Sequence, residues 1–121
     1  MHELSIAIRV VELAEEHLRA AGGGRVVAAT LRVGRLAAVD PEALRRALVL
    51  AADGTPLERA VFKIVDVPVR IHCPTCRQDV DLPGIVRLAC PTCGTRGGAI
   101  LAGGELELDS LEIVCPEEVS A

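Results

Sequence analysis

The chain has 121 residues, half of them hydrophobic, and a formal net charge of −4 at pH 7. This length suits one domain, or one domain with a small appendage. The sequence has a single Phe and no Tyr or Trp, so the core must form almost without aromatic residues. The acidic charge and the lack of a basic cluster argue against a nucleic-acid-binding protein, and no apolar run reaches the ~20 residues that a membrane span needs.

Two helices are predicted in the first half of the chain. From Ser5, a plausible N-cap, apolar residues recur with a helical period up to the glycines at 22–24. The segment Asp40–Glu42 combines a capping aspartate, a proline at the first helical position and an acid in the first turn. It predicts a second helix that ends near residues 53–56. Each helix has one apolar side, which is expected to pack on a sheet.

Three strands are predicted around these helices. Alternating apolar residues indicate a strand over 27–34, and β-branched residues indicate a longer one over 61–71, which lies at a sheet edge or breaks at Pro68. A third strand covers 106–113, where the alternation changes parity at 109–110 and indicates a bulge or a break. The order of elements predicts an α+β fold with a three-stranded sheet covered by two helices and an inserted zinc-ribbon-like module.

Four of the five cysteines form two close pairs, Cys73-Pro-Thr-Cys76 and Cys90-Pro-Thr-Cys93. Two residues between cysteines allow a tight turn to aim both sulfurs at one point, and two such turns complete the tetrahedron that Zn(II) accepts. Four thiolates leave no open coordination position, so the site is expected to be structural. Iron is the competing metal, and two short disulfides or free thiols are the alternatives without a metal.

Single residues near the two pairs carry weaker signals. Gly94 suits a turn that needs a positive φ angle, whereas Arg77 occupies the same position after the first pair, so the two turns are expected to differ. His72 directly precedes Cys73 and could replace a neighbouring thiolate as an alternate zinc ligand, although an exposed histidine at a strand end is the more common explanation. Cys115 is expected to be a buried or C-terminal thiol without a role.

The chain begins with Met1-His2-Glu3. An untrimmed α-amine on Met1, the following amide nitrogen and the His2 imidazole can close consecutive chelate rings around one metal ion, and Glu3 can add an oxygen. A donor set rich in nitrogen suits Ni(II) or Cu(II). On its own, the triplet is more often an ordinary chain end with an incidental histidine.

Four landmarks in order resemble the HypA/HybF family of hydrogenase-maturation nickel metallochaperones: MHELSIA, GRLAAVDPEAL, the pair CPTC and CPTCG, and GGELELDSLEI. The resemblance implies that residues 1–69 and 101–121 form a nickel-binding α+β domain, with His2 as the principal Ni(II) ligand and Glu3 assisting. It also implies that residues 70–100 form a zinc-binding module on the four paired cysteines. The chain differs from the family pattern at Arg77, where glycine is usual, and in a second helix without aromatics.

The same resemblance implies a cytoplasmic carrier and not an enzyme. Its expected partners are a maturation GTPase and the [NiFe]-hydrogenase large subunit, and in some organisms urease maturation proteins as well. Zn(II) is expected as a structural ion and Ni(II) as transient cargo. The competing hypothesis is a zinc-ribbon module for protein interaction or nucleic-acid binding that has no nickel function.

Overall fold

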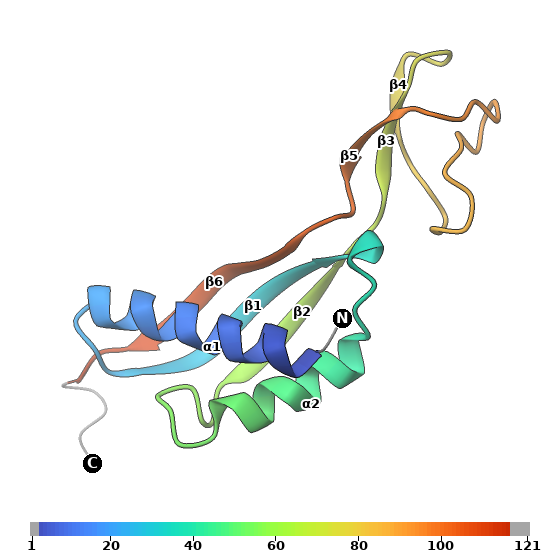
Figure 1. Cartoon of the computed structure of the whole chain (residues 1–121). Coiled ribbons are helices and arrows are strands. Elements are labelled where there is room, and N and C mark those ends of the chain that lie inside the picture. Colours follow the sequence, from blue (N-terminus) through green and yellow to red (C-terminus); the bar gives the residue numbers. More distant parts are fainter. Residues whose placement is uncertain (1–2, 117–121) are drawn as a thin grey trace. The chain divides into compact units, whose positions relative to one another are not determined.

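The computed structural model describes residues 3–116. Its elements follow the chain as α1 (Glu3–Ala20), β1 (Arg25–Gly34), a 3-10 turn (Arg35–Ala37), α2 (Pro41–Ala52), β2 (Val61–Val67), β3 (Arg70–Cys73), β4 (Gln78–Asp81), β5 (Ala99–Ala102) and β6 (Leu106–Val114), as labelled in Figure 1. The strands form two three-stranded sheets, β2-β1-β6 and β4-β3-β5. The first sheet with its two helices confirms the predicted α+β fold, and the second belongs to the cysteine module.

The chain divides into two compact units. The helical unit comprises the chain up to Leu31, the segment Val39–Ile64 and the chain from Leu108 onward. The cysteine unit comprises Arg32–Ala38 and Val65–Glu107. Strands β1, β2 and β6 therefore each contribute residues to both units.

In the helical unit, α1 and α2 pack against one another and lie over the same face of the sheet (Figure 1). Their buried residues are Ala7, Val10, Val11, Ala14 and Leu18 from α1, and Leu44, Ala47, Leu48 and Ala52 from α2. Small and branched side chains thus form the core, as expected for a chain with a single aromatic residue. Each buried leucine contributes roughly 1.5–3 kcal/mol to the free energy of folding. Within the described residues, none of the helices combines the length and the apolar character needed to cross a membrane.

The starts of the two helices differ in how well the sequence predicted them. At α2 the Asp40 carboxylate accepts a hydrogen bond from the Glu42 N–H over 3.0 Å, and Pro41 is the first helical residue, as predicted. At α1 the helix already begins at Glu3, so the predicted cap Ser5 lies inside the first turn. An acidic residue in the first turn is favourable beside the free N–H groups of the helix end, which supports this earlier start.

The single strand predicted over 61–71 is two strands, β2 and β3, in different sheets. Pro68 lies between them and has no N–H to donate to a sheet, so both predicted consequences hold: β2 is an edge strand and the pairing breaks at the proline. Val69 follows and is fully buried with Ile71 and Leu82 in the core of the cysteine unit. The break therefore marks a change of core as well as of sheet.

β6 is one continuous strand, so of the two predicted alternatives, a bulge or a break, the break is wrong. The parity change is present, because Asp109 and Ser110 are both exposed while Leu108 and Leu111 on either side are half-buried.

The cysteine unit contains two further strands that the sequence did not predict. β4 and β5 pair with opposite edges of β3, both antiparallel. Cys73 pairs with Gln78, which makes the first CPTC turn the tip of the β3–β4 hairpin. The hairpin therefore fixes where the first two thiols point.

Three chain segments lie in close contact where Gly34, Gly103 and Val69 meet within the cysteine unit. The Gly34 N–H donates to the Glu105 carbonyl over 2.6 Å, and the Leu36 N–H donates to the Gly103 carbonyl over 2.8 Å. A β-carbon on Gly34 would overlap the backbone of Gly103, and one on Gly103 would lie 2.8 Å from the Val69 Cα. Only glycine fits at these two positions.

Candidate metal centre

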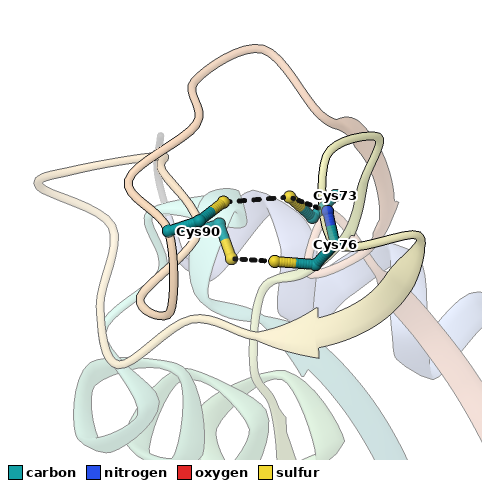
Figure 2. A group of neighbouring side chains, drawn as sticks. Cys73, Cys76 and Cys90 are labelled. Carbon is teal, nitrogen blue, oxygen red and sulfur yellow. Dashed lines mark hydrogen bonds between the residues drawn. The ribbon is translucent and has the colours of Figure 1, made fainter.

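The cysteine unit brings together the four paired cysteines. Their sulfur atoms all lie within 4.8 Å of one another. The Cys73 and Cys93 sulfurs are 3.5 Å apart and the Cys76 and Cys90 sulfurs are 3.9 Å apart, so the closest contacts join different pairs, as Figure 2 shows for Cys76 and Cys90. Four sulfurs around zinc, each at ~2.3 Å from the ion, have edges of ~3.8 Å. The cluster therefore fits a tetrahedral Zn(II) ion.

All four thiols are free. Because no sulfur is bonded to another, the alternative of two short disulfides within the CPTC pairs does not hold. A closed set of four thiolates leaves no position for a substrate, so the zinc that these residues would bind is structural.

The two CPTC turns have the same backbone geometry. The Arg77 N–H donates to the Cys73 carbonyl and the Gly94 N–H donates to the Cys90 carbonyl, each over 2.8 Å. Arg77 has φ 55° and Gly94 has φ 79°, so both residues lie in the left-handed region. The prediction that the first turn would differ is wrong, because both turns have the same hydrogen bond and end on a left-handed residue, even though Arg77 is not a glycine.

The sulfurs differ in their surroundings. Cys73 and Cys90 are buried, whereas Cys93 is exposed. The side-chain hydrogen bond from Thr95 is the main cause that lowers the pKa of Cys93 to about 6. Hydrogen bonding to Cys93 is in turn the main cause that raises the pKa of Cys76 to about 12. A divalent cation held by the four sulfurs would stabilise all four thiolates.

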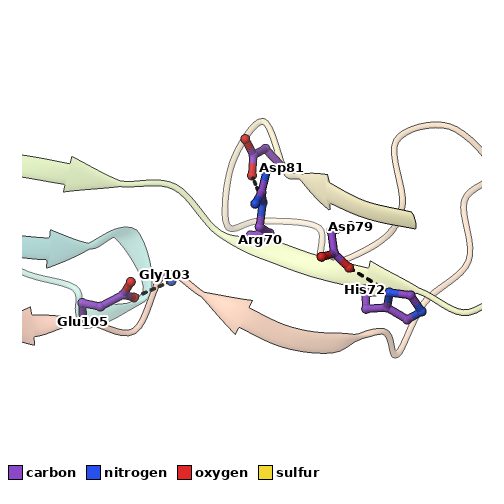
Figure 3. A network of polar contacts seen from close by, with 6 residues as sticks. All are labelled: Arg70, His72, Asp79, Asp81, Gly103 and Glu105. Atoms are coloured by element: carbon purple, nitrogen blue, oxygen red, sulfur yellow. Dashed lines mark hydrogen bonds and ion pairs between the residues drawn. The ribbon is translucent and has the colours of Figure 1, made fainter. Parts of the chain in front are cut away.

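His72 directly precedes Cys73 in the sequence, but its side chain contacts Asp79 and is not grouped with the four described thiols. Its Nδ1 is 2.8 Å from a carboxylate oxygen of Asp79 on β4, as Figure 3 shows. Along β3 the side chains alternate, so His72 is exposed while Ile71 and Cys73 on either side are buried. Within the described part of the chain, His72 is not in the group of potential metal ligands that the four cysteines form.

The predicted nickel ligands Met1 and His2 lie outside the described residues. Glu3 is the half-buried first residue of α1. It borders a surface hollow together with Leu4, Ala43, Arg46, Ala47 and Leu50.

Thr75 and Thr95 contact the cluster or its turns but were not predicted. Thr95 Oγ1 lies 3.1 Å from the Cys93 sulfur and 2.9 Å from Thr75 Oγ1. The sequence holds no signal for Thr95, because nothing in the spacing distinguishes it from the threonine inside the second CPTC motif. Cys115 is exposed at the end of β6, which rules out the buried alternative.

Known proteins resemble the chain over nearly its whole length. The model of one protein family, described as "Hydrogenase/urease nickel incorporation, metallochaperone, hypA", matches residues 1–113. A hydrogenase maturation factor HypA from Chloroflexus aggregans is 46% identical over 112 residues, which cover 93% of this chain and 98% of that protein. A HypA from Acidithiobacillus ferrooxidans is 38% identical over 113 residues, which cover 93% and 99%.

The fold is also similar to a solved structure, the solution structure of the Ni metallochaperone HypA from Helicobacter pylori. The TM-score is 0.68 at 24% identity, and the match covers 95% of this chain and 99% of that one. The sequence match over nearly the full length confirms the resemblance that the four landmarks indicated. The chain belongs to the HypA family, the nickel metallochaperones of hydrogenase maturation, which are carriers and not enzymes.

Proposed function

We propose that this chain binds its Ni(II) cargo through Met1, His2 and Glu3 and retains a structural Zn(II) at the four-cysteine centre. The observation that supports the proposal most is the family match, which begins at residue 1 and so includes the terminal triplet. In this proposal residues 1–69 and 101–121 serve nickel binding, and residues 70–100 serve zinc binding.

The proposed donors suit a carrier that must also release its ion. An α-amine, an amide nitrogen and an imidazole favour Ni(II), and a site with few protein ligands exchanges its ion more readily than a closed cage. An imidazole ordinarily titrates near ~6.5 and an α-amine near ~8. Both must be unprotonated to bind metal, so acidification is expected to weaken nickel binding.

The position of Glu3 supports a role beside the triplet's nitrogen donors. It heads α1, and that helix is anchored in the helical unit by buried residues such as Ala7 and Val10. A ligand on the first turn of a packed helix has a restricted range of positions, which limits the conformational entropy lost when a metal binds.

The test is a calorimetric Ni(II) titration of the untagged, zinc-loaded chain at neutral pH. We expect one tight nickel site in the wild type, its loss in His2→Ala, and no change in His17→Ala, a control because His17 is exposed near the far end of α1. Zinc content and far-UV circular dichroism are expected to stay the same in all three proteins. Wild-type affinity in His2→Ala contradicts the assignment, as does nickel binding that depends on the cysteines alone.

An N-terminally extended variant tests the α-amine. A few residues fused before Met1 remove the free amine there and leave the imidazole in place. We expect this extension to weaken nickel binding, and unchanged affinity would exclude the amine as a ligand. A chain that binds no nickel in any form would favour the competing hypothesis of a zinc-ribbon interaction module.

We further propose the immediate partners: a maturation GTPase, the large subunit of [NiFe]-hydrogenase as the recipient, and urease maturation proteins as a second route. The family description, which names both hydrogenase and urease, supports this proposal. The free cysteines fit a reducing cytoplasm. Nickel transfer from the loaded chain to each purified apo-recipient, measured by metal analysis after separation, distinguishes the routes.

A further inference from the structure

Two threonine hydroxyls connect the two halves of the four-cysteine centre. Thr75 lies inside the first CPTC turn, and Thr95 lies two residues after Cys93. Their Oγ1 atoms are 2.9 Å apart, and Thr95 Oγ1 is also 3.1 Å from the Cys93 sulfur. A single hydroxyl thus contacts a predicted zinc ligand on one turn and the side chain of the other turn.

When Cys93 is a thiolate, the number of available protons decides which group donates in the hydrogen bond between Thr95 and the Cys93 sulfur. A thiolate can only accept hydrogen bonds, and a threonine hydroxyl has one proton. In the structure Thr95 Oγ1 is placed to donate to Thr75 Oγ1. Opposite a Cys93 thiolate the two hydroxyls would rotate, so that Thr95 donates its proton to the Cys93 sulfur and Thr75 donates its own to Thr95 Oγ1. The result is a chain of two donors that ends on one sulfur.

The backbone keeps Thr95 in place for this role. Its carbonyl accepts a hydrogen bond from the Cys90 N–H over 2.9 Å, which fixes Thr95 relative to the second CPTC turn. The sulfur it contacts belongs to the exposed cysteine of the centre, whereas Cys73 and Cys90 are buried. The hydroxyl therefore contacts the thiol that external reagents reach most easily.

We propose that Thr95 is a positioning residue of the zinc centre, that its hydroxyl stabilises the Cys93 thiolate and lowers its nucleophilicity, and that Thr75 orients this hydroxyl. Hydrogen bonds from residues next to the metal ligands orient those ligands and tune the metal centre. A hydrogen-bond donor to a thiolate stabilises its negative charge and so makes the sulfur less reactive toward an electrophile. This role concerns the zinc centre alone and does not depend on where nickel binds.

The test compares zinc-loaded wild type with Thr95→Val, Thr95→Ser and Thr75→Val. Valine keeps the shape of threonine and removes the hydroxyl, whereas serine keeps the hydroxyl. Each protein is treated with iodoacetamide, the alkylation rate of each cysteine is measured by peptide mass mapping, and zinc affinity is measured by competition with a chromophoric chelator. In Thr95→Val we expect a several-fold faster reaction at Cys93 alone and about tenfold weaker zinc binding. Thr95→Ser should behave as wild type.

Thr75 provides a second, milder test because it acts through Thr95. Thr75→Val is expected to raise the Cys93 rate less than Thr95→Val does. The double variant Thr75→Val/Thr95→Val is expected to have the same Cys93 alkylation rate as Thr95→Val alone. The Thr95 hydroxyl that Thr75 orients is then absent, so the loss of the Thr75 hydroxyl has no further effect.

The proposal is overturned if Thr95→Val leaves the Cys93 rate unchanged, or if all four cysteines react faster together, since that pattern reports general loosening of the centre. If Thr95→Val does not retain zinc, Thr95→Ser and Thr75→Val decide. A Cys93 rate that stays at the wild-type value in Thr75→Val, or that rises in Thr95→Ser, contradicts the proposed chain of donors.

Discussion

Arg77 has the same left-handed backbone conformation as Gly94, its counterpart in the other CPTC turn, and makes the same hydrogen bond to the first cysteine of its pair. For a residue with a β-carbon this conformation costs roughly 1–2 kcal/mol, and for glycine it costs little. The first turn therefore contains backbone strain that the second does not.

Replacing Arg77 by glycine is expected to stabilise the zinc-loaded chain, by up to about 1 kcal/mol after the greater chain entropy of glycine in the unfolded state is subtracted. The measurement is thermal unfolding at a fixed excess of zinc. Gly94→Ala is the matched reverse change, because a β-carbon there has room, its nearest neighbour being an Arg87 nitrogen at 3.8 Å. It is expected to destabilise by about 1 kcal/mol through the backbone alone. If neither substitution moves the transition, the strain is absent.

Replacing Gly34 by alanine is expected to destabilise the chain by about 2–3 kcal/mol, because the added methyl group would overlap the backbone of Gly103. Denaturant unfolding at fixed zinc concentration measures the loss. Gly104→Ala is the control, since a β-carbon at Gly104 meets nothing within 4 Å and its φ angle is not in the left-handed region. Equal stability of the two variants would mean that the close approach at Gly34 is not a constraint.

Glu105 is expected to contribute stability that depends on pH. Its carboxylate accepts a hydrogen bond from the Gly103 N–H over 2.6 Å, drawn in Figure 3, and lies 3.6 Å from Arg32. The backbone hydrogen bond from Gly103 is the main cause that lowers the pKa of Glu105 below its ordinary value of 4.5. A lowered folded-state pKa stabilises the fold above pH 4.5, and this contribution is lost as the pH falls through the folded-state value.

Glu105→Gln is therefore expected to be less stable than wild type at neutral pH, with a difference that shrinks as the pH falls below 4.5. Unfolding curves recorded for both proteins over this range measure the difference, and zinc release at low pH affects both alike. Glu107→Gln serves as the control. It also removes one negative charge, from a carboxylate that lies 3.6 Å from Arg32. A Glu105→Gln difference that does not change with pH contradicts the assignment.

Removing zinc is expected to unfold the β4-β3-β5 sheet and to leave α1 and α2 helical. The core of the cysteine unit consists of Val69, Ile71 and Leu82 with two partly buried neighbours, which is too small to fold without a metal. After treatment with a chelator we expect the helical circular dichroism signal to persist while amide protons in the sheet exchange rapidly. Cys73→Ser should have the same effect, and Cys115→Ser should have none. Retained protection in β3 without zinc would show that the small core suffices.

Local sequence signals predicted the elements that depend on local chemistry. Asp40 and Pro41 marked the start of α2, and two residues between paired cysteines predicted which thiols meet. The strands β4 and β5 were missed because they are four residues long and mostly exposed, so they show no alternation of apolar and polar residues. Their pairing with β3 depends on contacts between distant segments, which a local pattern does not contain.

Two residues show why parts of the site were predicted less well. Arg77 has the left-handed conformation that closes the first CPTC turn, whereas residue preference alone suggested a different turn. Thr95 contacts Cys93 because of how its own turn is hydrogen-bonded, and the letters of the motif do not specify this. The grouping of the four cysteines could therefore be predicted from their spacing, and the residues that support it could not.

The close sulfur contacts between the two CPTC turns also affect the segment that joins them. An ion bound by the four sulfurs would hold both ends of this segment together, and the entropy of closing such a loop grows only slowly with its length. Within it, Ile85 is exposed and Val86 is fully exposed, and Gly84 has no neighbour that a β-carbon would meet within 4 Å. Residues 84–86 are thus a suitable place to insert an epitope or a fluorescent label, which would leave the chain's beginning unmodified during nickel measurements.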